Sequence, residues 1–289
     1  MTTHSYGAQT MGGRLRRVLV KRPDKAFAVE DSVKWHYTNR PDLNIAREEH
    51  DRFVDILRSA GAEVIYHDCL QPDRADAIYV HDPVIITDRG AIILRMGKVL
   101  RRGEEGAIEN KLAEIGVPIL YRMHGEATAE GGDLLWIDHG TLAVGQGFRT
   151  NWDGLRQLRE ALVPLEITVI PVSLVYFYGP AACLHLMSFV SIVGERTAVV
   201  YPPLMPVPFW QELQSHGFRF VEVPDEEFPT MGPNVLSLTP TSCVMLEGNP
   251  LTKERLERAG FEVFTYKGNE ISLKAEGGPT CLTRPIWRE

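Results

Sequence analysis

The stretch Arg258-Ala-Gly-Phe-Glu-Val-Phe264 has a form that recurs along the chain: the end of a helix, a glycine that breaks it, and a short apolar strand. The same form is found at residues 59–65, 114–120, 163–169 and 215–221. Glycine after a last helical turn adopts the left-handed conformation at low cost, and at 163–169 Pro164 stands in as the breaker. The breakers lie at residues 61, 116, 164, 217 and 260, a spacing typical of repeat proteins.

The segments between the breakers predict the rest of each repeat. Helices with apolar residues three and four positions apart precede the breakers, and in the first helix the predicted buried face consists of Ile45, Phe53, Ile56, Leu57 and Ala60. Short strand-like runs lie between the helices, separated by turn residues. These runs cover residues 77–80, 84–86, 91–94, 134–137, 141–144, 184–193, 197–200, 234–238 and 242–246.

Each unit therefore reads strand, strand, helix, strand. A single unit of this kind cannot bury its helix face alone, so we expect five units to pack around a common axis. This predicts one α/β domain over residues 1–289. A division into two domains is the alternative, but no boundary rich in Ser, Gly or Pro supports it.

Composition excludes several classes of protein. The 289 residues include 31 Lys and Arg against 38 Asp and Glu, a formal net charge of −7 that suits neither nucleic acid nor an anionic membrane. No apolar run approaches the roughly 20 residues that span a bilayer. Residues 1–7 lack the features of a secretory signal, so we expect a cytoplasmic protein with its four cysteines reduced.

Cys281 is the cysteine whose setting suggests chemistry. It follows Gly277-Gly-Pro-Thr, a constrained turn that can present a thiol at the start of a strand. A thiol attacks as the thiolate and needs a nearby cation, hydrogen-bond donor or base. From these residues alone, a small buried packing role remains open. Cys69, Cys183 and Cys243 lie beside or inside apolar strands, and we expect them to serve packing.

Two further sites could assist a nucleophile. Glu130-Gly-Gly-Asp133 is a turn whose carboxylates can orient an imidazole or bind a cation, although it could also be a charged hairpin turn. His185 lies in an apolar run, where a strand would hold it as a rigid base. A histidine packed in the core is the alternative.

Charged pairs indicate a possible ligand. Asp76 and Asp82 flank the predicted strand 77–80, and strand alternation places them on the same side, where they could hold a guanidinium. Arg101 and Arg149 precede helices and could bind a carboxylate. Solvated charges are the alternative for all four. The sequence has no zinc-binding spacing, P-loop or dinucleotide fingerprint, so we expect no metal and no organic cofactor.

These pieces occur in an order that resembles the guanidine-modifying enzymes of the pentein fold. Asp82, Glu130-Gly-Gly-Asp133, His185 and Gly277-Gly-x-x-Cys281 follow one another as in that superfamily, and the match covers nearly the whole chain. The superfamily includes arginine and agmatine deiminases, amidinotransferases and dimethylarginine dimethylaminohydrolases. The resemblance implies a five-bladed, pseudo-symmetric α/β propeller of ββαβ units around a central site.

Within the superfamily, the sequence most resembles dimethylarginine dimethylaminohydrolase. The segments that carry this likeness are Asp76-Ala-Ile-Tyr-Val-His-Asp82, Arg101-Arg102, Arg149, His185-Leu-Met-Ser188 and Thr280-Cys281. Two positions depart from that family. Met187 stands where the family has lysine and the deiminases have aspartate, and His81 stands where relatives have an acid. An apolar Met187 fits a guanidinium that carries methyl groups.

The resemblance also implies roles for individual residues. Cys281 would be the nucleophile, His185 the general acid and base, and Glu130 the partner that orients His185. The substrate would be a small cationic guanidino compound with an α-carboxylate, bound by Asp82, Asp76, Tyr79, His81, Met187, Arg101 and Arg149.

The predicted reaction is hydrolysis of Nω-methylated arginine to citrulline and a methylamine through an S-alkylthiouronium intermediate. Three alternatives remain: a hydrolase of arginine or of another guanidino or ureido compound, an amidinotransferase, and a non-catalytic pentein-fold binding protein. A homo-oligomer is possible.

Overall fold

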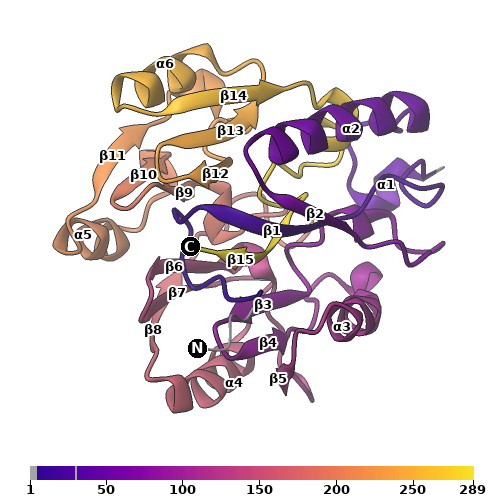
Figure 1. Ribbon diagram of the computed structural model, residues 1–289, viewed down its shortest axis with the longest axis horizontal. Coiled ribbons are helices and arrows are strands. Elements are labelled where there is room, and N and C mark those ends of the chain that lie inside the picture. The colour runs from indigo at the N-terminus through magenta and orange to yellow at the C-terminus, as the bar shows by residue number, and fades with distance from the viewer. Residues whose placement is uncertain (1–4, 30) are drawn as a thin grey trace.

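The fold is a ring of five small sheets. The computed structural model describes residues 5–29 and 31–289, and within them five three-stranded sheets are formed (Figure 1). Residues 1–4, on which part of the expectation about a secretory signal rests, lie outside the described residues. In the described part of the chain, no helix is long and apolar enough to cross a membrane.

Four of the sheets share one plan, which confirms the predicted ββαβ unit. In the second blade, β3 (Val84–Thr87) pairs antiparallel with β4 (Gly90–Ile93), and α3 (Glu104–Glu114) leads to β5 (Ile119–Arg122), which runs parallel to β4. The next three blades repeat this order, and their elements are β6 (Leu134–Asp138), β7 (Thr141–Gln146), α4 (Trp152–Leu162), β8 (Thr168–Ser173), β9 (Val190–Val193), β10 (Thr197–Val200), α5 (Val207–Ser215), β11 (Arg219–Glu222), β12 (Val235–Thr239), β13 (Ser242–Leu246), α6 (Pro250–Arg258) and β14 (Glu262–Tyr266).

The first blade joins the two ends of the described chain. β15 (Arg284–Arg288) pairs antiparallel with β1 (Leu15–Val20), and β1 runs parallel to β2 (Glu63–Tyr66). The long helix α2 (Leu43–Ser59) connects β1 to β2, and the short helix α1 (Ser32–Trp35) precedes it. The last strand therefore takes the place that β3 or β6 has in the other blades, so the ring closes through the strands nearest the termini (Figure 1).

The predicted breakers hold the left-handed conformation in four of the five repeats. Gly61, Gly116, Gly217 and Gly260 have φ of 92°, 79°, 76° and 97°. The third repeat differs from the prediction because Pro164 lies inside a short 3₁₀ helix. Glu166, with φ of 59°, takes the left-handed position there.

The predicted core face of α2 needs one correction. Phe53 and Leu57 are buried as expected, but Ile45 is 48% exposed. The buried stripe instead begins at Ala46 and continues through His50. Ile45 lies one residue away from that stripe, which is about 100° around the helix, so it faces solvent.

One predicted strand is not a strand, and in the predicted run 184–193 only Val190–Val193 form a strand. Residues 75–78 form a 3₁₀ helix instead of the strand expected at 77–80, and Leu186–Ser188 form another ahead of β9. Their apolar composition reflects burial at the centre of the ring, which periodicity cannot distinguish from sheet pairing. Asp76 therefore lies in a 3₁₀ helix and His185 directly before one, and neither lies on a strand.

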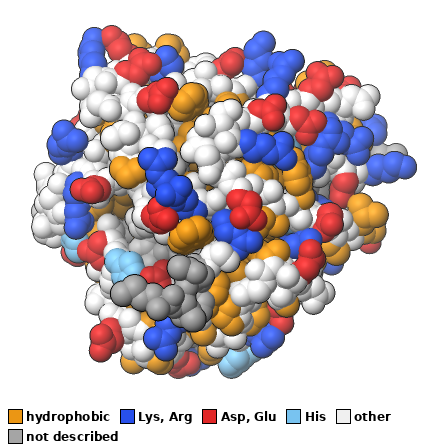
Figure 2. All heavy atoms as spheres, in the orientation of Figure 1, with side chains coloured by type: hydrophobic (Ala, Val, Ile, Leu, Met, Phe, Trp, Pro, Cys, Tyr) orange, Lys and Arg blue, Asp and Glu red, His pale blue; other side chains and the backbone are white. Residues whose placement is uncertain are grey.

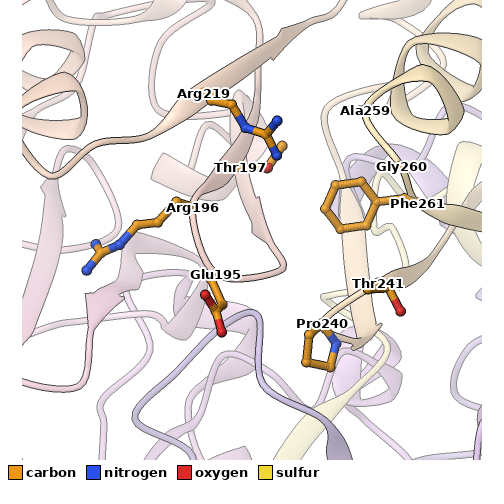
Figure 3. A pocket seen from close by; sticks show the side chains of 9 residues that line it. All are labelled: Glu195, Arg196, Thr197, Arg219, Pro240, Thr241, Ala259, Gly260 and Phe261. Carbon is orange, nitrogen blue, oxygen red and sulfur yellow. The ribbon is translucent and has the colours of Figure 1, made fainter.

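The outer surface is mixed in charge. On the face in Figure 2, basic and acidic side chains alternate, so this face presents no extended basic surface for a polyanion. A cavity of about 380 Å³ lies between the fourth and fifth blades (Figure 3). It is lined by Arg219 from β11, Thr197 from β10 and Phe261, among others. None of the predicted site residues lines it.

Candidate active site

The predicted site residues occupy equivalent places in successive repeats. Asp82 lies two residues before β3, Glu130 four before β6, His185 five before β9 and Cys281 three before β15. The fifth equivalent place, directly before β12, holds Asn234. Because the blades surround one axis, these segments meet at the centre of the ring. Hydrogen bonds between repeats join them, including Gly131 N–H to the Asp82 carbonyl at 2.9 Å.

His185 and Glu130 form a buried pair. His185 Nε2 lies 2.7 Å from Glu130 Oε2, and Lys98 N–H donates to Glu130 Oε1 at 2.8 Å, which holds the carboxylate in place. Burial alone would lower the pKa of His185. The nearby charges of Cys183 and Asp133, together with the hydrogen bond to Glu130, instead raise this pKa well above its ordinary value. With Nε2 on Glu130, the ring nitrogen that can exchange protons with a ligand is Nδ1.

Cys183 lies at that second nitrogen. Its Sγ is 3.6 Å from His185 Nδ1. Sequence reasoning assigned Cys183 to packing, although its place two residues before His185 could have indicated this contact. The packing prediction is also wrong for Cys69, which is exposed, whereas Cys243 is buried as expected.

Cys281 lies in a turn three residues before β15, as its glycine-rich sequence predicts. Asn234 Nδ2 donates to Cys281 Sγ at 3.7 Å. The Asn234 amide is itself held, because its Oδ1 accepts from Thr280 N–H and Oγ1 at 3.1 and 2.8 Å. Burial, and then the charge of Asp82, raise the pKa of Cys281 to about 11, while His185 acts in the opposite direction. Asn234 was not predicted.

Asp82 is buried, and both of its oxygens have partners. Gly132 N–H donates to Oδ1 at 2.9 Å and Arg101 Nη1 donates to Oδ2 at 2.5 Å. Although burial acts to raise the pKa of Asp82, the charge of Arg101 holds it below its ordinary range. Arg101 also contacts Glu104, a residue that sequence reasoning did not select. The second predicted arginine, Arg149, has its Nη1 3.6 Å from Glu130 Oε2.

Asp76 and Tyr79 are buried beside this group. Asp76 accepts from Tyr37 Oη at 2.8 Å and from Lys98 Nζ at 2.6 Å. Tyr79 Oη donates to the Ile271 carbonyl, and its own carbonyl accepts from Arg101 Nη2 at 2.9 Å. Strand alternation does not place Asp76 and Asp82 on one side, contrary to the prediction, because the intervening residues are not a strand.

His81 and Met187, the two departures from the family pattern, are both buried. His81 Nδ1 lies 2.9 Å from the Thr283 carbonyl, so Nδ1 carries the hydrogen. Burial lowers the pKa of His81 to about 3, which leaves the ring neutral at physiological pH. A neutral ring with a protonated Nδ1 offers Nε2 as an acceptor. Met187 packs in the apolar core beside Leu186 and Phe189.

Metal ligands are not assembled here. Over residues 5–29 and 31–289, no three His, Cys, Asp or Glu side chains are grouped so as to hold a metal ion. The chemistry available to the described site is that of a thiol, an imidazole paired with a carboxylate, and a second buried carboxylate.

Known proteins resemble this chain in sequence or in fold. A family model described as N,N dimethylarginine dimethylhydrolase, eukaryotic, matches residues 25–288. An N(G),N(G)-dimethylarginine dimethylaminohydrolase from Streptomyces coelicolor is 33% identical over 93% of this chain and 96% of its own. A dimethylarginine dimethylaminohydrolase structure from Pseudomonas aeruginosa, complexed with citrulline, has a TM-score of 0.78 at 24% identity and covers 93% of this chain and 98% of its own. An amidinotransferase structure from Microseira wollei has a TM-score of 0.81 at 16% identity, with coverages of 98% and 97%.

Proposed function

Because the chain belongs to the dimethylarginine dimethylaminohydrolase family of guanidino-group hydrolases, we propose that it hydrolyses Nω-methylated arginine to citrulline and a methylamine. The observation that carries the proposal is the convergence of a thiol, a carboxylate-bound imidazole and a second buried carboxylate from different repeats. Cys281, the His185–Glu130 pair and Asp82 make up this set. Such a set suits attack on a cationic carbon that must lose an amine.

In the first half of the reaction, the Cys281 thiolate adds to the guanidinium carbon while Asp82 stabilises the positive charge. The tetrahedral adduct collapses and the carbon–nitrogen bond to the methylated nitrogen breaks. His185 Nδ1 gives its proton to that nitrogen, so the amine leaves neutral. The product is a thiouronium group bound to Cys281.

In the second half, water attacks the thiouronium carbon. His185, now neutral, accepts a proton from the water, and Glu130 stabilises the imidazolium that forms. The carbon–sulfur bond breaks, and the remaining proton of the attacking water passes to solvent, which returns the thiolate and releases a neutral ureido product. No step needs an oxidant, and water is the only co-substrate.

Substrate charge helps to activate the thiol. In the free protein, burial and Asp82 hold the pKa of Cys281 at about 11, so the thiol is protonated at neutral pH. A guanidinium bound at Asp82 offsets that negative charge and places a cation next to the sulfur. Both effects lower the thiol pKa, so we propose that the thiolate forms when the substrate binds.

The apolar Met187 supports a methylated substrate. A methylated nitrogen has fewer N–H donors than a free one, so it gains less from a carboxylate and more from an apolar neighbour. The neutral His81 adds an acceptor without a charge. These two residues lead us to prefer methylated arginine to arginine as the substrate.

The direct test is a product assay. Purified protein is incubated with asymmetric dimethylarginine, monomethylarginine, arginine and agmatine, and the ureido product and released amine are measured. We expect the methylated arginines to be hydrolysed fastest and Cys281→Ser to be inactive. Faster turnover of arginine would identify a different hydrolase of the same type.

The same assay separates the remaining alternatives. Formation of ornithine that depends on an added amine would identify an amidinotransferase. If a chloroacetamidine probe failed to label Cys281 and no compound was turned over, a non-catalytic binding protein would be favoured.

A further inference from the structure

The carboxylate assigned to the substrate guanidinium already holds a guanidinium from the chain itself. Arg101 Nη1 donates to Asp82 Oδ2 at 2.5 Å, and Gly132 N–H occupies Oδ1. Each oxygen of Asp82 therefore already accepts one hydrogen bond in the free protein. A substrate guanidinium that approaches Oδ2 from the side of Arg101 competes with Nη1 for this oxygen.

The other side of Arg101 is held by Glu104. Nε lies 3.1 and 3.0 Å from the two carboxylate oxygens of Glu104, and Nη2 lies 2.8 Å from Oε2. Nη2 also donates to the Tyr79 carbonyl at 2.9 Å. These contacts leave Nη1 as the nitrogen that bonds to Asp82, and a small shift of the guanidinium that lengthens the Nη1–Oδ2 distance can keep Glu104 as its partner.

Because the three side chains are buried, a change of partner at Asp82 must keep the buried charges paired. The side chains of Asp82, Arg101 and Glu104 are each 4% exposed or less. Arg101 faces two carboxylates, and burial raises the pKa of one of them, Glu104, to about 7. A buried anion that loses its partner is costly. An incoming guanidinium replaces Arg101 at Asp82, and the displaced Nη1 then needs a new acceptor.

We propose that Arg101 is a specificity-determining residue that competes with the substrate for Asp82. The proposal rests on the function proposed above. A guanidino compound with a carboxylate displaces Nη1 of Arg101 from Asp82. The carboxylate of the compound then accepts the hydrogen bond from Nη1. A guanidino compound without a carboxylate must break the Arg101–Asp82 bond with no replacement, so the site discriminates against it.

The competition predicts opposite effects of one substitution on two ligands. Binding would be measured by calorimetry on a Cys281→Ser background, so that turnover does not interfere. In Arg101→Ala we expect Nω-methylarginine to bind about tenfold or more weakly and methylguanidinium about tenfold or more tightly. A hydrogen bond to a charged group has an effect of this size.

Arg149→Ala is the matched control. Arg149 is the other buried arginine of the site, and its nearest carboxylate is Glu130. We expect Arg149→Ala to weaken the binding of Nω-methylarginine and to leave the binding of methylguanidinium unchanged. If Arg101 were only a carboxylate anchor, the two variants would behave alike.

The proposal is overturned if methylguanidinium binds the Arg101→Ala variant no more tightly than it binds the Cys281→Ser protein without that substitution. Should Arg101→Ala fail to fold, Arg101→Met combined with Glu104→Gln removes the extra buried charge and makes the same prediction. The function proposed above has a separate readout, because it fails if the unmutated protein turns over no methylarginine. Tighter binding of methylguanidinium would still support the competition in that case.

Discussion

At the scale of single residues, the site depends on which groups carry charge before a ligand arrives. The sequence identified Cys281, His185, Glu130 and Asp82 because they stand in a family order. It did not identify Cys183. The spacing of two residues indicates that Cys183 and His185 are near each other, but the contact between their side chains depends on the path of the backbone between residues 183 and 185. Side-chain pairing of this kind is set by tertiary structure, so a single sequence does not contain it directly.

The thiol of Cys281 should be unreactive in the free protein at neutral pH. Its pKa of about 11 means that alkylation by iodoacetamide should rise with pH through 9 without a plateau. Asp82→Asn removes a charge that raises this pKa, so alkylation at pH 7.5 should increase about tenfold for each unit by which the pKa falls. Labelling of the peptide that contains Cys281, followed by mass spectrometry, measures this separately from Cys69 and Cys183. A plateau below pH 9 in the unmutated protein would contradict the prediction.

Cys183 should tune the proton affinity of His185. The charge of Cys183 is the largest influence that raises the pKa of His185 against the effect of burial. Cys183→Ala removes it, so the imidazolium becomes less stable and its pKa should fall. The pH profile of kcat and the NMR titration of the ring should both shift to lower pH. Cys69→Ala, at an exposed thiol, is the matched control and should shift neither.

At the scale of elements, the turns before the first strand of each repeat hold the site. The sequence located most sheet strands, including Thr197–Val200 and Ser242–Leu246. It misread residues 77–80 and part of 184–193 as strands, because a buried turn and a buried strand have the same apolar composition. Asn234 could have been found by position, since the other four repeats place a candidate residue just before the first strand. The repeat predicts where a residue lies more reliably than what it contacts.

The turn Gly131–Asp133 should tolerate no side chain at Gly132. A methyl group there would overlap with the imidazole of His185, which would move away from Glu130. A misplacement of about 1 Å can cost roughly 100-fold in rate, so we expect kcat of Gly132→Ala to fall by about that factor or more. Circular dichroism would show that the fold is kept.

Gly106→Ala is the control for this substitution. Gly106 lies in α3, and a methyl group there meets nothing within 4 Å. We expect unchanged kcat and a free energy of unfolding that rises by up to about 1 kcal/mol, because alanine favours the helix. Equal losses of activity in both variants would show that Gly132 has no special relation to His185.

At the scale of the whole molecule, closure of the ring places the site. Cys281 precedes β15, which belongs to the first blade only because it pairs with β1. Arg288 strengthens this closure, since Nη2 donates to the Ser237 carbonyl in the fifth blade at 2.9 Å. Cys281 therefore reaches the centre only when the two ends of the described chain have come together. We propose that the five blades form one domain that unfolds as a unit.

This proposal predicts that damage to one blade lowers the stability of all. Ile286 on β15 and Leu158 on α4 are both fully buried, in blades one and three. Ile286→Ala and Leu158→Ala should each reduce the free energy of unfolding by about 2–5 kcal/mol. If the ring is one cooperative unit, far-UV circular dichroism, tryptophan fluorescence and exposure of the Cys281 thiol should report the same denaturant midpoint in each variant. If Ile286→Ala exposed Cys281 at a lower denaturant concentration than that at which the other probes change, the first blade would be opening on its own. The ring would then consist of a stable part and a pair of strands, β1 and β15, that separates from it first.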